Sequence, residues 1–212
     1  MISVAGKPIL DWIIQWLIGN EIPHIVVGVA YKKETVKEHI QHLGANAEFD
    51  FSEHTVEGGT GEGFRLAIKR YVSDDRFLAM NGDEITNINV SEFANFHVRF
   101  GGLATIAVSN LRSPFGVVEI DGDSIVNFKE KTLLDAYVST GVYIFDHGIL
   151  ELLPIKGNIE NDTFPRLARD GQLRAYRHKG FWGTINTLKD LQEVERELKK
   201  GILTARQNPH SS

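Results

Sequence analysis

Short apolar runs of strand length alternate with longer segments of helical spacing over the first 110 residues of the chain. The first helical segment is bounded by Pro8 and Gly19, which suit the start and the end of a helix. We expect strands over residues 24–30, 47–51, 76–81 and 103–109, and helices over residues 7–19, 33–43, 60–72 and 90–100. This alternation predicts an α/β fold with a mostly parallel sheet and helices on both faces.

After Asn110 the pattern changes to strands joined by tight turns, with Asp121–Gly122–Asp123 as a hairpin turn. We expect strands over residues 115–121, 122–131 and 137–146, short helices over 147–153 and 161–169, and an amphipathic helix over 188–200. One domain over residues 1–205 is therefore expected. It consists of an α/β half (1–110) and a strand-rich half (111–205), and a polar tail (206–212) follows it.

Composition excludes several classes of protein. The net charge of -5 argues against a nucleic-acid groove and gives no reason to expect binding to an anionic membrane. There is no cysteine, which excludes a disulfide scaffold and a thiolate metal site and fits a reducing cytoplasm. No apolar run reaches the ~18 residues that span a bilayer, and the sequence begins without a basic-then-apolar signal segment.

The stretch LAMNGDE, residues 78–84, begins as a buried strand and ends in a glycine and two carboxylates. Ligands of open parallel sheets bind beyond the carboxyl ends of the strands, where Asp83 stands. A carboxylate at that position can hold Mg²⁺ against phosphate oxygens. The alternative is an aspartate that only caps a turn, which is common after a strand.

Further blocks follow one another along the chain: VAGKPILDWII, EGGTGEGFRLA, FLAMNGDEIT, SPFGVVEIDGDSIVNFKEK, VSTGVYIFD, NDTFPRLARDGQLRAYRHKGFW and NTLKDL. In this order they resemble the sugar-1-phosphate nucleotidylyltransferases, the enzymes that make nucleotide sugars. The resemblance covers residues 2–200. It implies a Rossmann-like sheet with an inserted sugar-binding β region, so that residues 1–110 become the nucleotide-binding half and 111–205 the sugar-binding half.

The resemblance also implies the reaction and its partners. A phosphate oxygen of a sugar 1-phosphate attacks the α-phosphate of a nucleoside triphosphate, and pyrophosphate leaves. Catalysis is then mostly alignment and charge neutralisation by Mg²⁺ and basic groups. The implied partners are the nucleoside triphosphate and the sugar 1-phosphate, with neither nucleic acid nor membrane among them.

The matching positions give each candidate residue a role by resemblance. Asp83 is the implied metal ligand and catalytic residue, and Lys131 is implied to face the phosphate. The implied nucleotide-binding residues are Gly59, Thr60, Asn81 and Gly82. The implied sugar-binding residues are Gly116, Glu130, Lys131, Thr140 and Gly141. Structural alternatives stay open for these motifs: a flexible loop before a helix for EGGTGEG, a strand-start glycine for Gly116, and an exposed ion pair for Glu130 and Lys131.

One part of the family pattern is missing. Relatives carry a glycine-rich loop with an arginine after their first strand, whereas this sequence opens at MISVAGKPIL, which matches the family just after that loop. The sheet pattern agrees, because the first helix is the one helix of the α/β half with no strand before it. A strand plus loop of roughly 20 residues is absent. We expect the open centre of the sheet to be collapsed, or filled by another segment, a partner chain or a second copy.

A second departure concerns the metal. Most relatives have an aspartate two residues after the tryptophan of GFW, whereas this chain has Thr184 there and Asn186 two residues further on. Neutral oxygens can coordinate a hard cation but do not offset its charge. Three interpretations are open: a shortened form of an active enzyme, a naturally short member whose sheet a partner chain completes, or a non-catalytic binding or regulatory subunit of the same fold.

Overall fold

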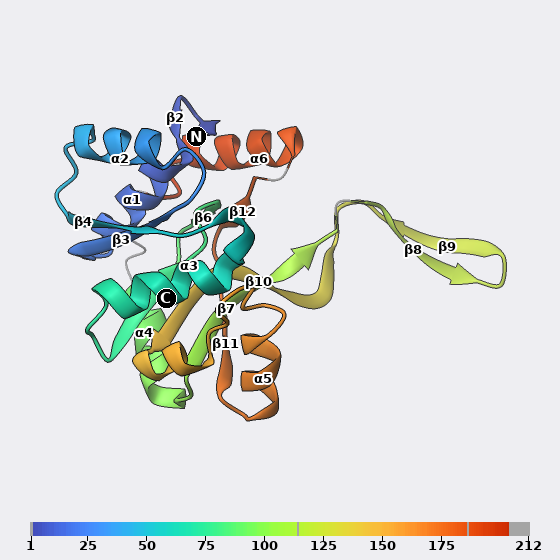
Figure 1. Ribbon diagram of the computed structural model, residues 1–212. Helices are drawn as coiled ribbons and strands as arrows, with labels where there is room; N and C mark the ends of the chain where they lie inside the picture. The colour runs from blue at the N-terminus through green and yellow to red at the C-terminus, as the bar shows by residue number, and fades with distance from the viewer. Residues whose placement is uncertain (1, 114, 186, 204–212) are drawn as a thin grey trace.

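The computed structural model describes residues 2–113, 115–185 and 187–203, and it shows an α/β body from which one two-stranded ribbon projects (Figure 1). The helices are α1 (Ile9–Gly19), α2 (Lys33–His42), α3 (Gly59–Tyr71), α4 (Val90–Phe100), α5 (Thr163–Arg169) and α6 (Leu188–Lys199), with 3-10 turns η1 (Val56–Gly58) and η2 (His147–Leu152). The strands are β1 (Ser3–Val4), β2 (Lys7–Pro8), β3 (His24–Val29), β4 (Glu48–Glu53), β5 (Arg76–Met80), β6 (Glu84–Thr86), β7 (Ala104–Arg112), β8 (Val117–Asp121), β9 (Ser124–Lys129), β10 (Leu133–Asp146), β11 (Leu173–Arg177) and β12 (Trp182–Thr184).

A short hairpin precedes the first helix, where the sequence predicted helix from residue 7. β1 and β2 pair antiparallel, with Ser3 opposite Pro8. Helix α1 therefore begins at Ile9, and Pro8 is its N-cap residue, a place where a missing N–H costs nothing. The indole N–H of Trp12 donates to the carbonyl oxygen of Val4 at 2.9 Å, which holds the hairpin against the helix.

The larger sheet contains four strands in the order β11-β7-β10-β5. β10 runs antiparallel to both β5 and β7, and β11 runs parallel to β7, so β5, β7 and β11 point the same way. β3 and β4 form a separate parallel pair, which lies to one side of the larger sheet in Figure 1. The predicted mostly parallel α/β fold is confirmed, with β10 as the reversed strand. β7 and β10, which come from the two expected halves of the chain, are neighbours in one sheet.

The centre of the sheet is open. In the part of the chain that the structure describes, β3 pairs only with β4 and β5 only with β10. A cavity of about 740 Å³ lies between β3 and β5, and α1 and α3 also line it. We call this cavity the strand slot, bounded by residues 24–28 on one side and 76–80 on the other. It lies at the centre of the sheet, where the sequence pattern predicts an unfilled place.

Two hydrophobic cores lie on the two sides of the sheet. α1, α4 and α6 contribute to one of them, through Ile14, Phe93 and Leu198. α3 and α5 contribute to the other, through Ile68 and Phe164. Within the described ranges, no helix is both long and apolar enough to cross a lipid bilayer. The expected tail at residues 206–212 lies outside the described residues.

The projecting ribbon, residues 117–129, is formed by β8 and β9, and we call it the arm (Figure 1). One set of its side chains is polar, and Glu119 accepts hydrogen bonds from Asn127 at 3.1 Å and from Lys129 at 2.9 Å. Val117 is partly buried, and the other apolar side chains of the arm are exposed to solvent; they are Val118, Ile120, Ile125, Val126 and Phe128. A single two-stranded ribbon is at best marginally stable in water, so the arm depends on the body for its order.

Candidate active site

The carboxyl end of β5 is followed by the glycine and the two acidic residues of the LAMNGDE stretch. The N–H of Asn81 donates to the carbonyl oxygen of Gly141 at 2.8 Å, which ties this end of β5 to β10. Gly82 and Asp83 follow, and both are exposed. Nothing lies within 4 Å of the position that a Cβ atom on Gly82 would occupy, so the backbone there is open to a ligand. The structure therefore places Asp83 at the strand end where open sheets bind ligands.

Thr140 and Gly141 lie in β10, next to the carboxyl end of β5. The Thr140 hydroxyl is buried and donates to the carbonyl oxygen of Ala107 at 2.8 Å. Gly141 has a φ of +69°, and a Cβ atom on it would come within 2.9 Å of the Asn81 side-chain nitrogen. Glycine is required here both for the left-handed conformation and for the close approach. Gly141 lies beside Asn81 and the Thr140 side chain is engaged within the protein, so the predicted contact of these two residues with the sugar stays a prediction.

Glu84 is a buried carboxyl that the sequence did not single out. It is 7% exposed, and its Oε2 accepts a hydrogen bond from the indole N–H of Trp182 at 2.8 Å. Burial, together with the neighbouring charge of Asp83, raises the pKa of Glu84 to about 8. The side chain is therefore largely protonated at neutral pH. Two acidic residues after a strand are typical of an exposed turn. The sequence therefore gives no indication that Glu84 is buried.

The raised pKa of Glu84 predicts a pH-dependent stability. The folded state holds the proton more tightly than the unfolded state, so stability is fully present below pH 4.5 and is lost as pH rises through 8. Replacing Glu84 with glutamine keeps an acceptor for Trp182 and removes the titration. We expect the free energy of unfolding of E84Q to lie within about 1 kcal/mol of that of the unmodified protein at pH 5 and to exceed it by about 4 kcal/mol at pH 9. Urea unfolding at both pH values, without divalent cations, measures this, and equal loss of stability in both proteins would contradict it.

Gly59 and Thr60 begin helix α3 and clamp it to a distant loop. Gly59 has a φ of +68°, and a Cβ atom on it would lie 2.7 Å from the carbonyl oxygen of Gly157. The Thr60 hydroxyl donates to Glu160 at 2.9 Å and accepts from the N–H of Ile159 at 3.1 Å. The structure thus gives these residues a structural contact, and their predicted contact with a nucleotide stays a prediction.

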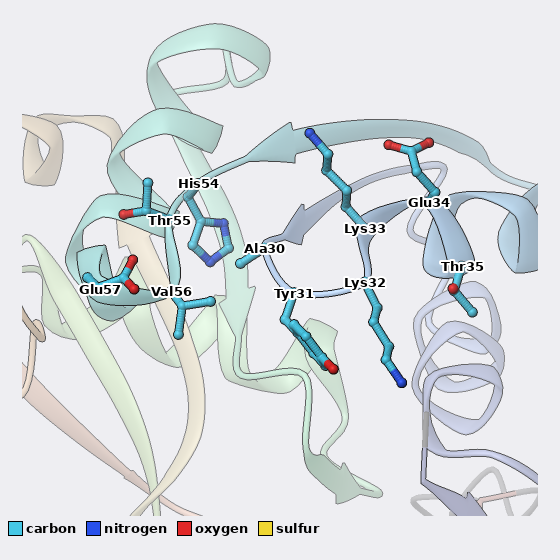
Figure 2. A pocket seen from close by; sticks show the side chains of 10 residues that line it. All are labelled: Ala30, Tyr31, Lys32, Lys33, Glu34, Thr35, His54, Thr55, Val56 and Glu57. Atoms are coloured by element: carbon cyan, nitrogen blue, oxygen red, sulfur yellow. The ribbon is translucent and has the colours of Figure 1, made fainter.

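A hollow of about 530 Å³ adjoins the turn before α3 (Figure 2). Residues 30–35 and 54–57, which follow the ends of β3 and β4, line it. Figure 2 shows the His54 ring facing Ala30 across the hollow and the Tyr31 ring on the adjoining loop. Tyr31 is 75% exposed, and the Lys32 ammonium lies 5.4 Å from the centre of its ring. An exposed ring with a lysine beside it offers a surface for stacking a planar base and attracting phosphate.

The remaining predicted residues lie at the base of the arm. Gly116 precedes β8, and a Cβ atom there would clash with the ring of Phe128 at 2.2 Å. Glu130 and Lys131 are exposed in the turn between β9 and β10, where the Lys131 carbonyl oxygen accepts from Arg112 at 3.0 Å. Nine residues, about 30 Å of extended chain, separate Lys131 from Gly141. The structure therefore brings Asn81, Gly82, Asp83, Thr140 and Gly141 together, and it does not bring Gly116, Glu130 and Lys131 to them.

The donors around Asp83 fit an open magnesium site. Among the described residues, no group of three or more carboxylate, histidine or cysteine side chains forms a closed metal site. Thr184 lies opposite Glu84 in the β6–β12 pairing, one position along from Asp83, and Asn186 lies outside the described residues. Mg²⁺ keeps several waters and takes one or two carboxylates plus substrate phosphates. A single exposed carboxylate with a hydroxyl-bearing residue nearby matches that preference.

Comparison with solved structures supports the same fold. HddC from Yersinia pseudotuberculosis superposes with a TM-score of 0.75 and 22% sequence identity, and the match covers 93% of this chain and 88% of that one. A putative glucose-1-phosphate thymidylyltransferase from Bacillus anthracis gives a TM-score of 0.70 at 18% identity and covers 100% of this chain and 87% of that one.

Comparison with known sequences identifies the family. The chain is 29% identical to a probable glucose-1-phosphate cytidylyltransferase from Bacillus subtilis, over 93% of this chain and 87% of that protein. It is 30% identical to the catalytic subunit beta of mannose-1-phosphate guanylyltransferase from Drosophila pseudoobscura pseudoobscura, over 90% of this chain but 54% of that protein. The chain thus spans about half the length of the guanylyltransferase. Because the model of the nucleotidyl transferase family matches residues 1–201, the chain belongs to that family.

Proposed function

We propose that the protein transfers a nucleotidyl group from a nucleoside triphosphate to a sugar 1-phosphate and releases pyrophosphate. The observation that carries this proposal is the exposed Asp83 carboxylate at the end of β5, next to the open backbone of Gly82. The family match and the names of the relatives, which transfer cytidylyl and guanylyl groups to sugar 1-phosphates, support it.

The reaction needs no covalent bond between the protein and a substrate. A phosphate oxygen of the sugar 1-phosphate forms a bond to the α-phosphorus, while the bond from that phosphorus to the bridging oxygen breaks. The bridging oxygen leaves with the electron pair as part of pyrophosphate. The protein therefore contributes alignment and charge neutralisation. Bound Mg²⁺ supplies positive charge against the phosphate oxygens, and Asp83 would hold it.

The geometry suggests how the nucleotide is placed. The base would enter the hollow of Figure 2, where Tyr31 offers a stacking face and Lys32 a positive charge. The phosphates would then extend toward Gly82, where the bare backbone leaves room. The sugar would lie over Gly141. The predicted roles of Glu130 and Lys131 require the substrate to meet the base of the arm.

Pyrophosphate release tests the proposed function. The protein is incubated with Mg²⁺, each of the common nucleoside triphosphates and a panel of hexose 1-phosphates, including glucose and mannose 1-phosphate. We expect release with at least one pair, dependent on both substrates and abolished by a chelator. Nucleotide binding without release in every combination would instead indicate a non-catalytic subunit and would overturn the proposal.

We also propose that the protein acts in the cytoplasm. The chain contains no cysteine and therefore gains nothing from an oxidising compartment. Nucleoside triphosphates and sugar phosphates are the reactants that this function needs.

A further inference from the structure

The carboxyl of Glu84 occupies the space in front of Gly141. A Cβ atom on Gly141 would lie 3.0 Å from Oε1 of Glu84 and 2.9 Å from its Cγ. Any other side chain at this position of β10 would therefore collide with Glu84 as well as with Asn81. A molecule that approaches the bare Cα atom of Gly141 from this side consequently meets the carboxyl of Glu84 first.

Trp182 holds this carboxyl in one orientation. Its indole N–H lies 2.8 Å from Oε2 of Glu84 and 3.0 Å from the carbonyl oxygen of Thr140, and it donates to both. Because Oε2 is taken by Trp182, Oε1 is the oxygen that faces Gly141. A side chain that is already fixed in this way loses little conformational entropy when it binds a ligand, so Glu84 is prepared for a contact through Oε1.

Glu84 also adjoins the proposed reaction centre. It follows Asp83 directly, and the charge of Asp83 acts on it. The side-chain nitrogen of Asn81 approaches the same point in front of Gly141, at 2.9 Å from the Cβ position. Asn81 and Glu84 thus flank the place where the sugar would lie. Alignment of the phosphates by Asp83 and Mg²⁺ leaves Glu84 without a role.

The fold does not need a carboxyl at this position. Glu84 is 7% exposed and stands next to a second carboxylate, and burying an ionisable side chain in such a place costs stability. The gain for the fold is small, because the indole N–H of Trp182 already has the carbonyl oxygen of Thr140 as an acceptor. A polar side chain that is costly to bury and that satisfies no donor on its own is typical of a functional site.

We propose that Glu84 binds a hydroxyl group of the sugar 1-phosphate through Oε1 and thereby helps to select the sugar. This inference rests on the proposed function, which places the sugar over Gly141. A carboxyl oxygen accepts a hydrogen bond from a hydroxyl group when it is ionised and donates one when it is protonated, so both forms make the contact. The substrate class is a hexose 1-phosphate with a free hydroxyl group at the carbon that meets Glu84. A deoxy analogue would bind more weakly, because Oε1 would be left without a partner.

Binding of deoxy sugars tests the inference. Calorimetry gives the dissociation constants of each hexose 1-phosphate of the panel and of its monodeoxy analogues, with Mg²⁺ and a non-hydrolysable nucleoside triphosphate present. We expect the unmodified protein to bind one analogue about 30-fold more weakly than the parent sugar. E84M, which keeps the length of the side chain but has no oxygen, should reduce this ratio to about threefold or less. E84Q keeps hydrogen-bonding groups and should retain a ratio of about tenfold.

Two further variants keep the test decisive. T86V removes a buried hydroxyl group from the same strand, where Thr86 is 2% exposed and donates to the carbonyl oxygen of Phe181 at 3.1 Å. This variant should lower the melting temperature and leave the discrimination unchanged. E84D keeps the carboxyl but withdraws it from Gly141, and it takes the place of E84M if that variant does not fold. E84D should lose the discrimination in the same way.

Four results would overturn the inference. The first is equal binding of the parent sugar and all its analogues, or no binding of any hexose 1-phosphate, by the unmodified protein. The second is discrimination that persists in E84M and E84D. The third is discrimination that is lost in T86V as well, since the effect would then be structural. The fourth is a higher Mg²⁺ requirement of E84M with unchanged discrimination, which would assign Glu84 to the metal.

Pyrophosphate release separates this inference from the proposed function. Release by a protein whose discrimination is the same in E84M would leave the transfer reaction standing without the contact at Glu84. Discrimination that depends on Glu84, without release in any combination, would leave the sugar contact standing without the transfer reaction.

Discussion

Replacing Asp83 with asparagine is expected to lower the rate of pyrophosphate release at least 100-fold, with little change in the melting temperature. The carboxylate is exposed at the end of β5, so the fold does not depend on it. Asparagine keeps the shape and an oxygen ligand but removes the negative charge that holds Mg²⁺ against the phosphates. Steady-state rates with the best substrate pair, measured across a range of Mg²⁺ concentrations, give the effect. We expect the residual activity of D83N to require more Mg²⁺.

The matched control is D123N, which makes the same change in the turn of the arm, where the aspartate is also exposed. It should leave both rate and Mg²⁺ dependence unchanged. If D83N and D123N have equal rates, Asp83 does not hold the metal, and the carboxyl end of β5 is not the reaction centre.

Replacing Phe145 with alanine is expected to reduce the free energy of unfolding by about 3–5 kcal/mol. Phe145 is fully buried in β10, stacked on Tyr143 with ring centres 5.3 Å apart. It also meets Phe64 of α3 and Phe77 of β5 edge-on, each at 6.0 Å. The substitution removes these contacts together and leaves a cavity between helix and sheet. Urea or thermal unfolding measures the loss.

Two further variants separate burial from the loss of a ring. F145L keeps most of the volume and should cost about 1.5 kcal/mol or less. F115A removes the same ring from a side chain that is 75% exposed and should change stability by about 0.5 kcal/mol or less. If F115A and F145A were equally destabilising, the aromatic cluster around Phe145 would not be the source of the stability.

The spacing of apolar residues predicted most helices and strands of the α/β body, because each of these elements buries one face at regular intervals. Residues 33–43 and 90–100 show the helical spacing that α2 and α4 realise nearly to the residue. An unfilled place in the sheet was also expected, because the sequence pattern shows no apolar run of strand length before the first helix. Short elements such as β6 and β12 were missed, because three residues are too few to establish a period.

Part of the candidate site comes together through backbone pairing. Asn81 and Gly141 are in contact because β5 and β10 are neighbours, a pairing that the sequence did not predict. Glu84 could not be predicted, since its burial depends on Trp182, which lies 98 positions further along the chain. The position of Lys131 depends on the course of the paired strands β7 and β10, whose register is irregular at two places. No local sequence pattern encodes these irregularities.

The turn at Gly122 separates, along the chain, strands that are neighbours in the larger sheet. The residues before this turn form β5 and β7, and the residues after it form β10. In the larger sheet, β10 lies between β5 and β7. Neither fragment can complete the larger sheet alone, yet each supplies the strands that the other lacks. A chain severed in that turn should therefore stay assembled, and the two pieces, produced separately, should find each other and rebuild the molecule.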